Sequence, residues 1–171
     1  MQHCLTQETI IMIRDAAGEV RTEPLSFFDP LLAGEPDDSR LSQYLLLSRS
    51  GWSAIEAVSR RRLWENEQLY HIMTRSGRIS LTGDHSLPVK RGIEELSVPA
   101  SQVKAGDALL MLEQPRLGKK APPLGEDPSF RAFGVLSVTR ETGYEGNVYQ
   151  VETADGTFVA NGFLVQRPQG L

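Results

Sequence analysis

The most constraining feature of the chain is a succession of short β-strand patterns separated by turn residues. Val, Ile, Leu, Tyr and Thr dominate these segments, and Gly, Asp or Asn stand between them. Strands do not alternate with long helical patterns, which argues against a parallel doubly wound sheet. We therefore predict an all-β domain, with strands at residues 9–13, 20–25, 43–48, 69–74, 78–82, 108–112, 134–141, 147–153 and 157–165.

Residues 52–68 are the segment in which a helix competes with a strand. Trp52, Ile55 and Val58 recur at helical spacing, and most of the other residues are acceptable helix formers. We predict a helix for this segment.

Four other segments interrupt the strand pattern. A helical turn limited by Pro30 is expected within residues 26–32, and another before the Gly-Asp of residues 97–110. Residues 32–40 are acidic and rich in breakers, and residues 113–130 hold four prolines and no apolar period. We predict surface loops for these last two, and expect the longer one to be mobile and to tolerate insertion or splitting near its middle.

Composition and charge exclude several classes of partner. The chain has 171 residues, enough for one domain with a sizeable core, and 40% hydrophobic against 23% charged residues is a globular balance. A net charge of −4 provides no basic surface, and the clusters SRRRLW and LGKK are too short to bind nucleic acid. The start of the chain lacks the basic region of a signal peptide, and no apolar run reaches membrane-spanning length. We predict a cytoplasmic domain without nucleic-acid or membrane partners.

Cys4 is the single cysteine, so an internal disulfide is impossible. No Cys/His cluster with metal-ligand spacing is present, and we expect neither metal nor cofactor. A lone cysteine is either a small core residue or a nucleophile. Its surroundings in the sequence must decide between the two.

Three segments occur in a suggestive order. CLTQETIIMIRDAAGE places Cys4 directly before a strand pattern, YHIMTRSGRISLTGDHSLPV places Thr82 three residues before His85, and YEGNVYQVETADGTFVANGFLV forms two closing strands. Each signal is weak alone: a Thr-x-x-His can be a turn with a solvated histidine, and Asn161 with the following glycine is a hairpin turn first. His71, inside a strand pattern, is most simply a packed or surface histidine.

Together these segments resemble the Hint superfamily, the fold of inteins and of hedgehog autoprocessing domains. Inteins are the closer match, because SGWSAIEAVSRRR, LTGDHSLPV and ASQVKAGDALL all resemble intein sequence. The resemblance implies an all-β, horseshoe-like fold of two intertwined, pseudo-symmetric halves with at most one or two short helices.

The resemblance also divides the chain. Residues 4–167 would be the domain, and residues 1–3 and 168–171 would be flanks belonging to the host protein. Residues 113–130 fall where larger inteins carry a homing endonuclease, so the chain resembles a mini-intein.

The chemistry implied by the resemblance starts at the bond between His3 and Cys4. Cys4 would attack the carbonyl of His3 and convert the amide into a thioester. His85 would protonate the leaving nitrogen, a task suited to a pKa near neutrality, and Thr82 would hold the scissile amide or the oxyanion. Asp84 is a further candidate, because with the preceding glycine it forms the tight connection that turns both side chains to one side.

The C-terminal end departs from the family. Inteins end in a histidine and an asparagine followed by Cys, Ser or Thr, and here Gln166, Arg167 and Pro168 stand at the matching positions. Gln150 replaces a frequent aspartate, and Gly156 replaces a common histidine. Arginine cannot cyclise as asparagine does, so the departures affect the second half of the reaction.

We therefore expect a single-turnover, autocatalytic domain that forms a thioester at Cys4 and releases the upstream segment to water, a thiol or another nucleophile. It would act in cis on its flanking host segments, as a monomer. Two alternatives remain open: a full intein whose C-terminal residues were replaced so that a precursor is trapped, and a degenerate Hint domain that serves as an inert structural module.

Overall fold

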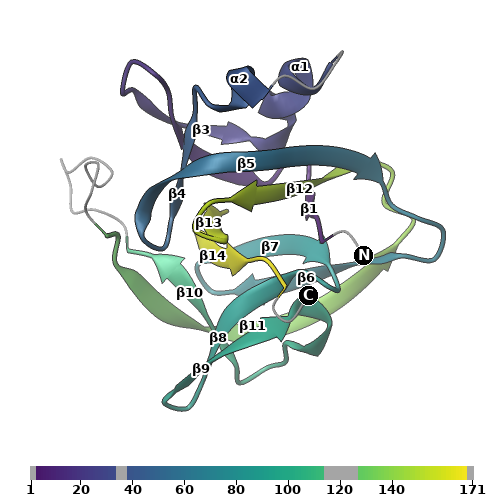
Figure 1. The fold of residues 1–171 in the computed structure, drawn as a ribbon. Helices are drawn as coiled ribbons and strands as arrows, with labels where there is room; N and C mark the ends of the chain where they lie inside the picture. Colours follow the sequence, from purple (N-terminus) through teal and green to yellow (C-terminus); the bar gives the residue numbers. More distant parts are fainter. Residues whose placement is uncertain (1–2, 34–37, 114–126, 169–171) are drawn as a thin grey trace.

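The structure is a computed structural model that describes residues 3–33, 38–113 and 127–168. Within these residues, 14 strands form one antiparallel sheet that curls around a common core (Figure 1). The first seven strands are β1 (Leu5–Thr6), β2 (Ile10–Arg14), β3 (Val20–Pro24), β4 (Leu45–Ser48), β5 (Gly51–Arg62), β6 (Gln68–Thr74) and β7 (Gly77–Thr82). The others are β8 (Ser86–Arg91), β9 (Glu94–Pro99), β10 (Ala108–Leu112), β11 (Phe130–Thr142), β12 (Asn147–Thr153), β13 (Thr157–Ala160) and β14 (Phe163–Gln166). The predicted all-β class is confirmed.

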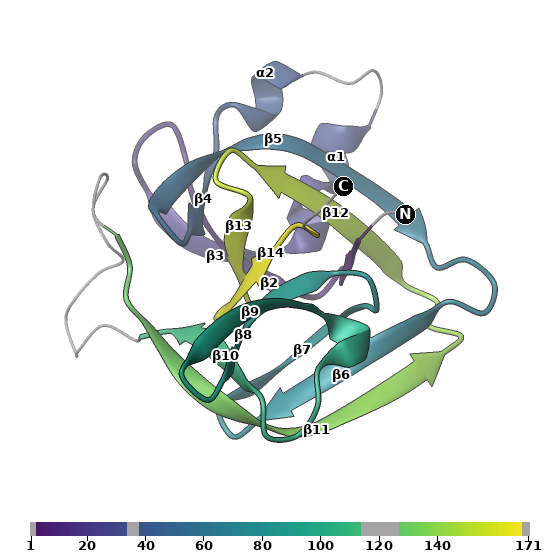
Figure 2. The same cartoon turned by 60° about the horizontal axis from the view of Figure 1, so that its bottom comes forward.

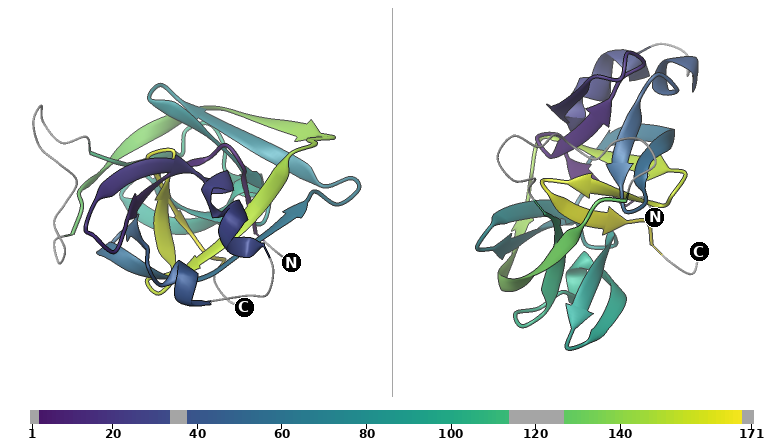
Figure 3. Two further views of the ribbon diagram at one scale, coloured as in Figure 1. Left: turned by 90° about the horizontal axis from the view of Figure 1, so that it is seen from above. Right: turned by 90° about the vertical axis from the view of Figure 1, so that its left-hand side faces the viewer.

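The sheet is built from two halves that exchange strands. β5 pairs along most of its length with β12, and β6 pairs with β11. The links between β5 and β6 and between β11 and β12 therefore run beside each other from one half to the other (Figures 1 and 2). The sheet closes where β10 pairs with both β8 and β14, which leaves the fold wrapped around its core (Figure 3).

The helix expected at residues 52–68 is wrong, because most of that segment is strand β5. Ile55 and Val58 face the core together because a β-bulge lies between them: Thr153 pairs with Ile55, and Val151 pairs with Val58. Buried side chains normally recur every two residues in a strand, and the extra residue of the bulge lengthens this interval to three. Ile55 and Val58 therefore show helix-like spacing although no helical turn is present. The long ladder with β12 outweighs the local helix propensity.

A hairpin of β8 and β9 was also absent from the sequence-based prediction. Pro88 lies within β8 and lacks an N–H, and a proline inside an apolar run usually argues against a strand. Most of β9 is exposed, so its sequence shows no buried face. Gly92 makes the turn between the two strands with a φ of 63°.

Short helices occupy the connections. They are the 3₁₀ helices η1 (Leu25–Phe28) and η2 (Ala100–Gln102), and the α-helices α1 (Asp29–Leu32) and α2 (Asp38–Leu41). The two expected helical turns are thereby confirmed. Pro30, however, lies in the first turn of α1, where its missing N–H is tolerated, so it helps to begin that helix rather than limiting it. No helix in the described ranges is long and apolar enough to cross a membrane.

The predicted loop at 113–130 falls mainly on residues 114–126, which lie outside the described residues. Its two ends are neighbours, because Leu112 at the end of β10 pairs with Phe130 at the start of β11. The expected mobility and tolerance to splitting stay predictions. Residues 1–2 and 169–171 of the expected flanks also lie outside the described part of the chain.

Candidate active site

Cys4 is held at the centre of the fold by backbone pairing on two sides. β1 starts at the next residue, where Leu5 pairs with Leu81 of β7 and with Tyr149 of β12. The N–H of Thr82 also donates to the carbonyl oxygen of Cys4 at 2.9 Å. Cys4 is 1% exposed, so the single thiol of the chain belongs to the interior.

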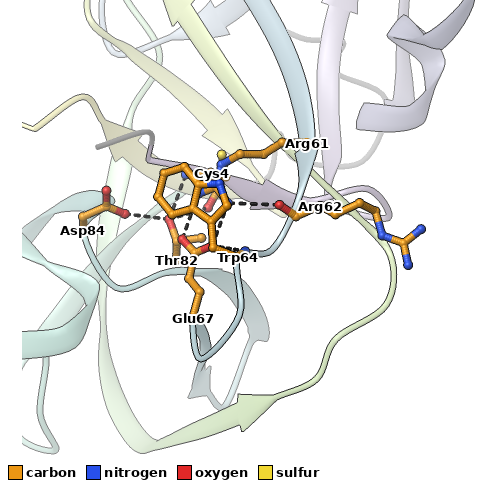
Figure 4. Close-up of polar contacts among 7 residues, drawn as sticks. All are labelled: Cys4, Arg61, Arg62, Trp64, Glu67, Thr82 and Asp84. Carbon is orange, nitrogen blue, oxygen red and sulfur yellow. Dashed lines mark hydrogen bonds and ion pairs between the residues drawn. The ribbon is translucent and has the colours of Figure 1, made fainter.

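Thr82 binds the backbone nitrogen of Cys4. The backbone N–H of Cys4 donates to the Thr82 hydroxyl oxygen at 2.8 Å, and that hydroxyl donates to Asp84 at 2.8 Å (Figure 4). β7 ends at Thr82, and the turn that follows returns the chain so that Thr82 and Asp84 lie on the same side. Thr82 was expected to hydrogen-bond either the amide before Cys4 or the oxyanion, and the contact present in the structure is with the amide nitrogen.

His85 lies against the side chain of His3. Its ring is 1% exposed and meets the ring of His3 edge to face, with a distance of 5.0 Å between the ring centroids. Nδ1 of His85 lies 3.1 Å from the carbonyl oxygen of Ser86, which can only accept. Nδ1 therefore carries the proton in the neutral ring, and Nε2 presents a lone pair.

The protonation state of His85 differs from the expected one. Burial, assisted by the neighbouring His3, lowers the pKa of His85 to about 3. The ring is neutral at pH 7, so it must first accept a proton before it can donate one. The expectation of a pKa near neutrality is wrong, because a fully buried imidazolium is strongly disfavoured.

His3 is also buried, at 5% exposure. Burial lowers its pKa, and the carboxylates of Asp84 and Glu152 partly oppose that effect. Nε2 of His3 has no hydrogen-bond partner among the described residues. The residue that precedes Cys4 is thus packed in the interior against His85.

The thiol of Cys4 lies in an apolar environment made by Leu69 and Val148, with Leu63 and Tyr144 at its edge. The pKa of Cys4 is raised to about 12, mainly by burial; Arg61 opposes the increase, and Asp84 and Glu67 contribute to it. Cys4 is therefore a neutral thiol in the resting state. Chemistry at this sulfur requires a base and a partner for the thiolate.

Arg61 is a site residue that the sequence analysis missed. It lies near the end of β5, opposite Val148 in β12, and its guanidinium hydrogen-bonds the Cys4 side chain. Arg61 lies within SRRRLW, a cluster that is too short to bind nucleic acid and that forms part of the intein-like segment, but neither property predicts a contact with Cys4. Had β5 been recognised, its register would have placed Arg61 beside the residues that pack on Cys4.

Comparison with solved structures establishes the fold. The mini-intein of transcription factor IIB Mvu aligns with a TM-score of 0.75 at 14% identity, over 98% of this chain and 100% of that one. An intein from a hyperthermophile aligns with a TM-score of 0.76 at 13% identity, over 96% and 99% of the two chains. The DnaX mini intein from Spirulina platensis gives 0.62 at 19% identity, over 96% and 99%. The chain has the intein fold.

No protein-family model and no curated protein sequence matches the chain. At identities below one fifth, the intein fold is recognised through its three-dimensional arrangement. The expected Hint horseshoe is thereby confirmed.

The C-terminal strand of this intein fold reaches the same place as Cys4. Gln166 at the end of β14 pairs with Ser86, the residue after His85. Arg167 is exposed, and its backbone N–H donates to Gly156 at 3.0 Å. Gln166 therefore stands opposite the residue that follows His85, and neither Gln166 nor Arg167 is a histidine or an asparagine.

Gln150 stands where inteins often carry an aspartate. Its amide nitrogen donates to Glu152 at 2.9 Å, and its Oε1 is buried without a partner among the described residues. An uncharged amide at this position cannot supply the negative charge of an aspartate. In the described residues, no group of three or more His, Cys, Asp or Glu side chains is arranged to hold a metal ion.

An open cavity of about 490 Å³ lies beside the site, and its lining includes Asp84, Trp64, Glu67 and Tyr70. Gly83 forms part of its wall, where a Cβ would come within 2.8 Å of the Tyr70 ring. The close approach explains why the residue between Thr82 and Asp84 is a glycine.

Thr82→Val tests the anchoring of the amide nitrogen. Valine keeps the shape of threonine but leaves the buried N–H of Cys4 without its acceptor, so the free energy of unfolding should fall by about 1–3 kcal/mol. Urea denaturation measures this change. Thr22→Val, on the exposed face of β3, is the matched control and should stay within about 0.5 kcal/mol of the parent. Equal stabilities of the two variants would contradict the assignment.

Proposed function

We propose that this domain is an intein-like, self-processing domain that rearranges the His3–Cys4 peptide bond into a thioester and thereby releases the segment upstream of Cys4. The observation that carries the proposal is the contact set around this one bond. Thr82 binds its nitrogen, His85 contacts the residue that supplies its carbonyl, and Cys4 supplies the sulfur.

The first step moves one proton and forms one bond. Neutral His85 accepts the proton of the Cys4 thiol at Nε2, and the thiolate attacks the carbonyl carbon of His3. A five-membered ring with a tetrahedral carbon results, and its negative charge resides on the former carbonyl oxygen.

The second step breaks the C–N bond. The protonated His85 returns its proton to the nitrogen of Cys4, which leaves as an amine, and the carbonyl re-forms as a thioester between His3 and the sulfur. A histidine whose pKa is lowered to about 3 by burial is a strong proton donor once protonated, which suits this step. No net oxidation or reduction occurs, and no cofactor is required.

The fate of the thioester follows from the C-terminal residues. Arg167 offers no carboxamide that could attack its own backbone carbonyl, and Gln166 has no proton to donate as a histidinium does. We therefore propose release of the upstream segment alone, to water or to a small nucleophile.

The decisive experiment extends the full chain by an upstream protein segment and incubates it with a strong thiol. Intact-mass measurement should find the upstream segment released as a thioester that ends at His3, and a domain that retains its C-terminal flank. A ligated product of the two flanks, or a fragment ending at Gln166, would instead establish a complete intein reaction. Absence of any cleavage would establish an inert module.

A further inference from the structure

Arg61 brings a partly buried positive charge to the Cys4 sulfur (Figure 4). Its two terminal nitrogens donate to the two carboxylate oxygens of Glu67 at 2.6 and 2.8 Å. The ring of Trp64 covers the guanidinium, with 3.9 Å between Cζ and the ring centroid. Only 12% of the Arg61 side chain is exposed, so its charge is poorly screened by water.

The turn after β5 fixes this arrangement. Asn66 adopts a φ of 67°, a left-handed conformation that asparagine tolerates well, and so returns the chain toward Arg61. The N–H of Trp64 donates to the Glu67 carboxylate at 3.0 Å, and the N–H of Glu67 donates to the carbonyl of Trp64 at 3.0 Å. The guanidinium is therefore held in place before any reaction begins.

The reaction proposed above creates a thiolate in an unfavourable place. Apolar side chains surround the sulfur, and the carboxylates of Asp84 and Glu67 both act against a negative charge there. The groups whose charges act on the sulfur are these two carboxylates and Arg61. Arg61 is the one among the three that stabilises the reactive form.

We infer that Arg61 is a further catalytic residue of the proposed acyl shift, which stabilises the Cys4 thiolate from the moment its proton passes to His85 until the sulfur bonds to the carbonyl carbon of His3. As the C–S bond forms, the negative charge leaves the sulfur for the carbonyl oxygen, and the contact with Arg61 weakens. Glu67 and Trp64 are positioning residues that hold the guanidinium. This inference depends on the proposed function for its role in turnover.

Arg61→Gln in the upstream-extended chain tests the inference. An opposite charge within hydrogen-bond reach lowers a pKa by about 1–3 units, and a thiolate gains nucleophilicity with a Brønsted slope of about 0.5 as its pKa rises. The two effects together predict thiol-dependent cleavage that is about three- to thirty-fold slower at pH 7. Arg61→Lys keeps the charge and should recover most of this loss. Arg62→Gln is the matched control, because that side chain points away from Cys4 (Figure 4), and it should cleave at the parental rate.

A role in the structure alone would give a different pattern. Lysine and glutamine both lose the two-pronged contact with Glu67, so equal rates for Arg61→Lys and Arg61→Gln would overturn the inference. Equal rates for Arg61→Gln and Arg62→Gln would overturn it as well. Thermal unfolding of each variant identifies any loss that comes from misfolding.

A second readout separates this inference from the proposed function. Cys4 is the single thiol, so its exchange with the small neutral disulfide 2,2′-dithiodipyridine reports its reactivity without any cleavage. If the parental chain releases no upstream segment, the proposed function fails. Arg61→Gln should still slow the disulfide exchange by the same three- to thirty-fold, because the exchange rate changes by about half a power of ten for each unit of thiol pKa. Unchanged exchange in Arg61→Gln would overturn the assignment of Arg61.

Discussion

Cys4→Ala should abolish thiol-dependent release of an upstream segment altogether. Alanine has no nucleophile, and the bond at this position is then an ordinary peptide bond. The loss should therefore exceed that of every other single substitution discussed for this chain. Intact-mass measurement after incubation with hydroxylamine or a thiol checks the result, because even a small thioester population is converted to a released fragment.

The control for Cys4→Ala is a substitution in the same apolar cluster. Val148→Ala removes a buried side chain that packs on Cys4 but keeps the thiol, so it should lower stability and still allow cleavage. This comparison separates loss of the nucleophile from loosening of its surroundings. Release of the upstream segment from Cys4→Ala would show that the thioester is not an intermediate.

Much of the sheet could be predicted from sequence because its strands carry local signals. Segments such as 69–74 and 147–153 combine β-branched and aromatic residues with bounding turns, and both became strands at nearly the predicted positions. Asn161 with its glycine neighbour makes the β13–β14 turn at φ of 52° and 83°, the left-handed values that such a turn requires. These features depend on residues close together in the chain.

β5 could not be predicted in the same way because its conformation depends on distant pairing. The bulge between Ile55 and Val58 imitates helical spacing, and only the register with β12 reveals it. The same error concealed Arg61, whose contact with Cys4 joins residues 57 positions apart. A long-range contact of a charged residue leaves no periodic trace in the sequence.

In the candidate site, too, some features could be predicted from the sequence and others depend on the fold. Cys4, Thr82 and His85 were predicted from the resemblance to inteins, and the structure brings Thr82 to the nitrogen of Cys4 and His85 to the ring of His3. Their protonation states were not predictable, because the pKa of His85 and of Cys4 is set by burial within the folded core. Residue type identifies the participants in such a reaction, and the fold decides which of them holds the proton.

His85→Ala should slow N-terminal cleavage by about 10²- to 10⁴-fold, the range that a positioned general acid or base contributes. In the proposed reaction His85 carries the proton from the sulfur to the departing nitrogen, and without it the proton must travel through water that the buried site admits poorly. Single-turnover cleavage followed by intact mass measures the rate. His71→Ala is the matched control: His71 lies on β6, hydrogen-bonded to Ser80 and Glu141, and the proposed reaction does not use it. A similar loss in both variants would contradict the assignment.

The stability of the same variants gives His85 an independent test. The folded-state pKa of about 3 lies below the ordinary histidine value of 6.5, so the unfolded chain binds a proton between these pH values that the folded chain does not. The parental domain should therefore lose stability as pH falls through that window, by up to about 1.4 kcal/mol per pH unit from this residue. Urea unfolding between pH 7 and pH 4, within the window set by this pKa, should show the slope reduced in His85→Gln and retained in His71→Gln. An unchanged slope in His85→Gln would mean that His85 is protonated in the folded state, and the proposed transfer from the Cys4 thiol to a neutral imidazole could not occur.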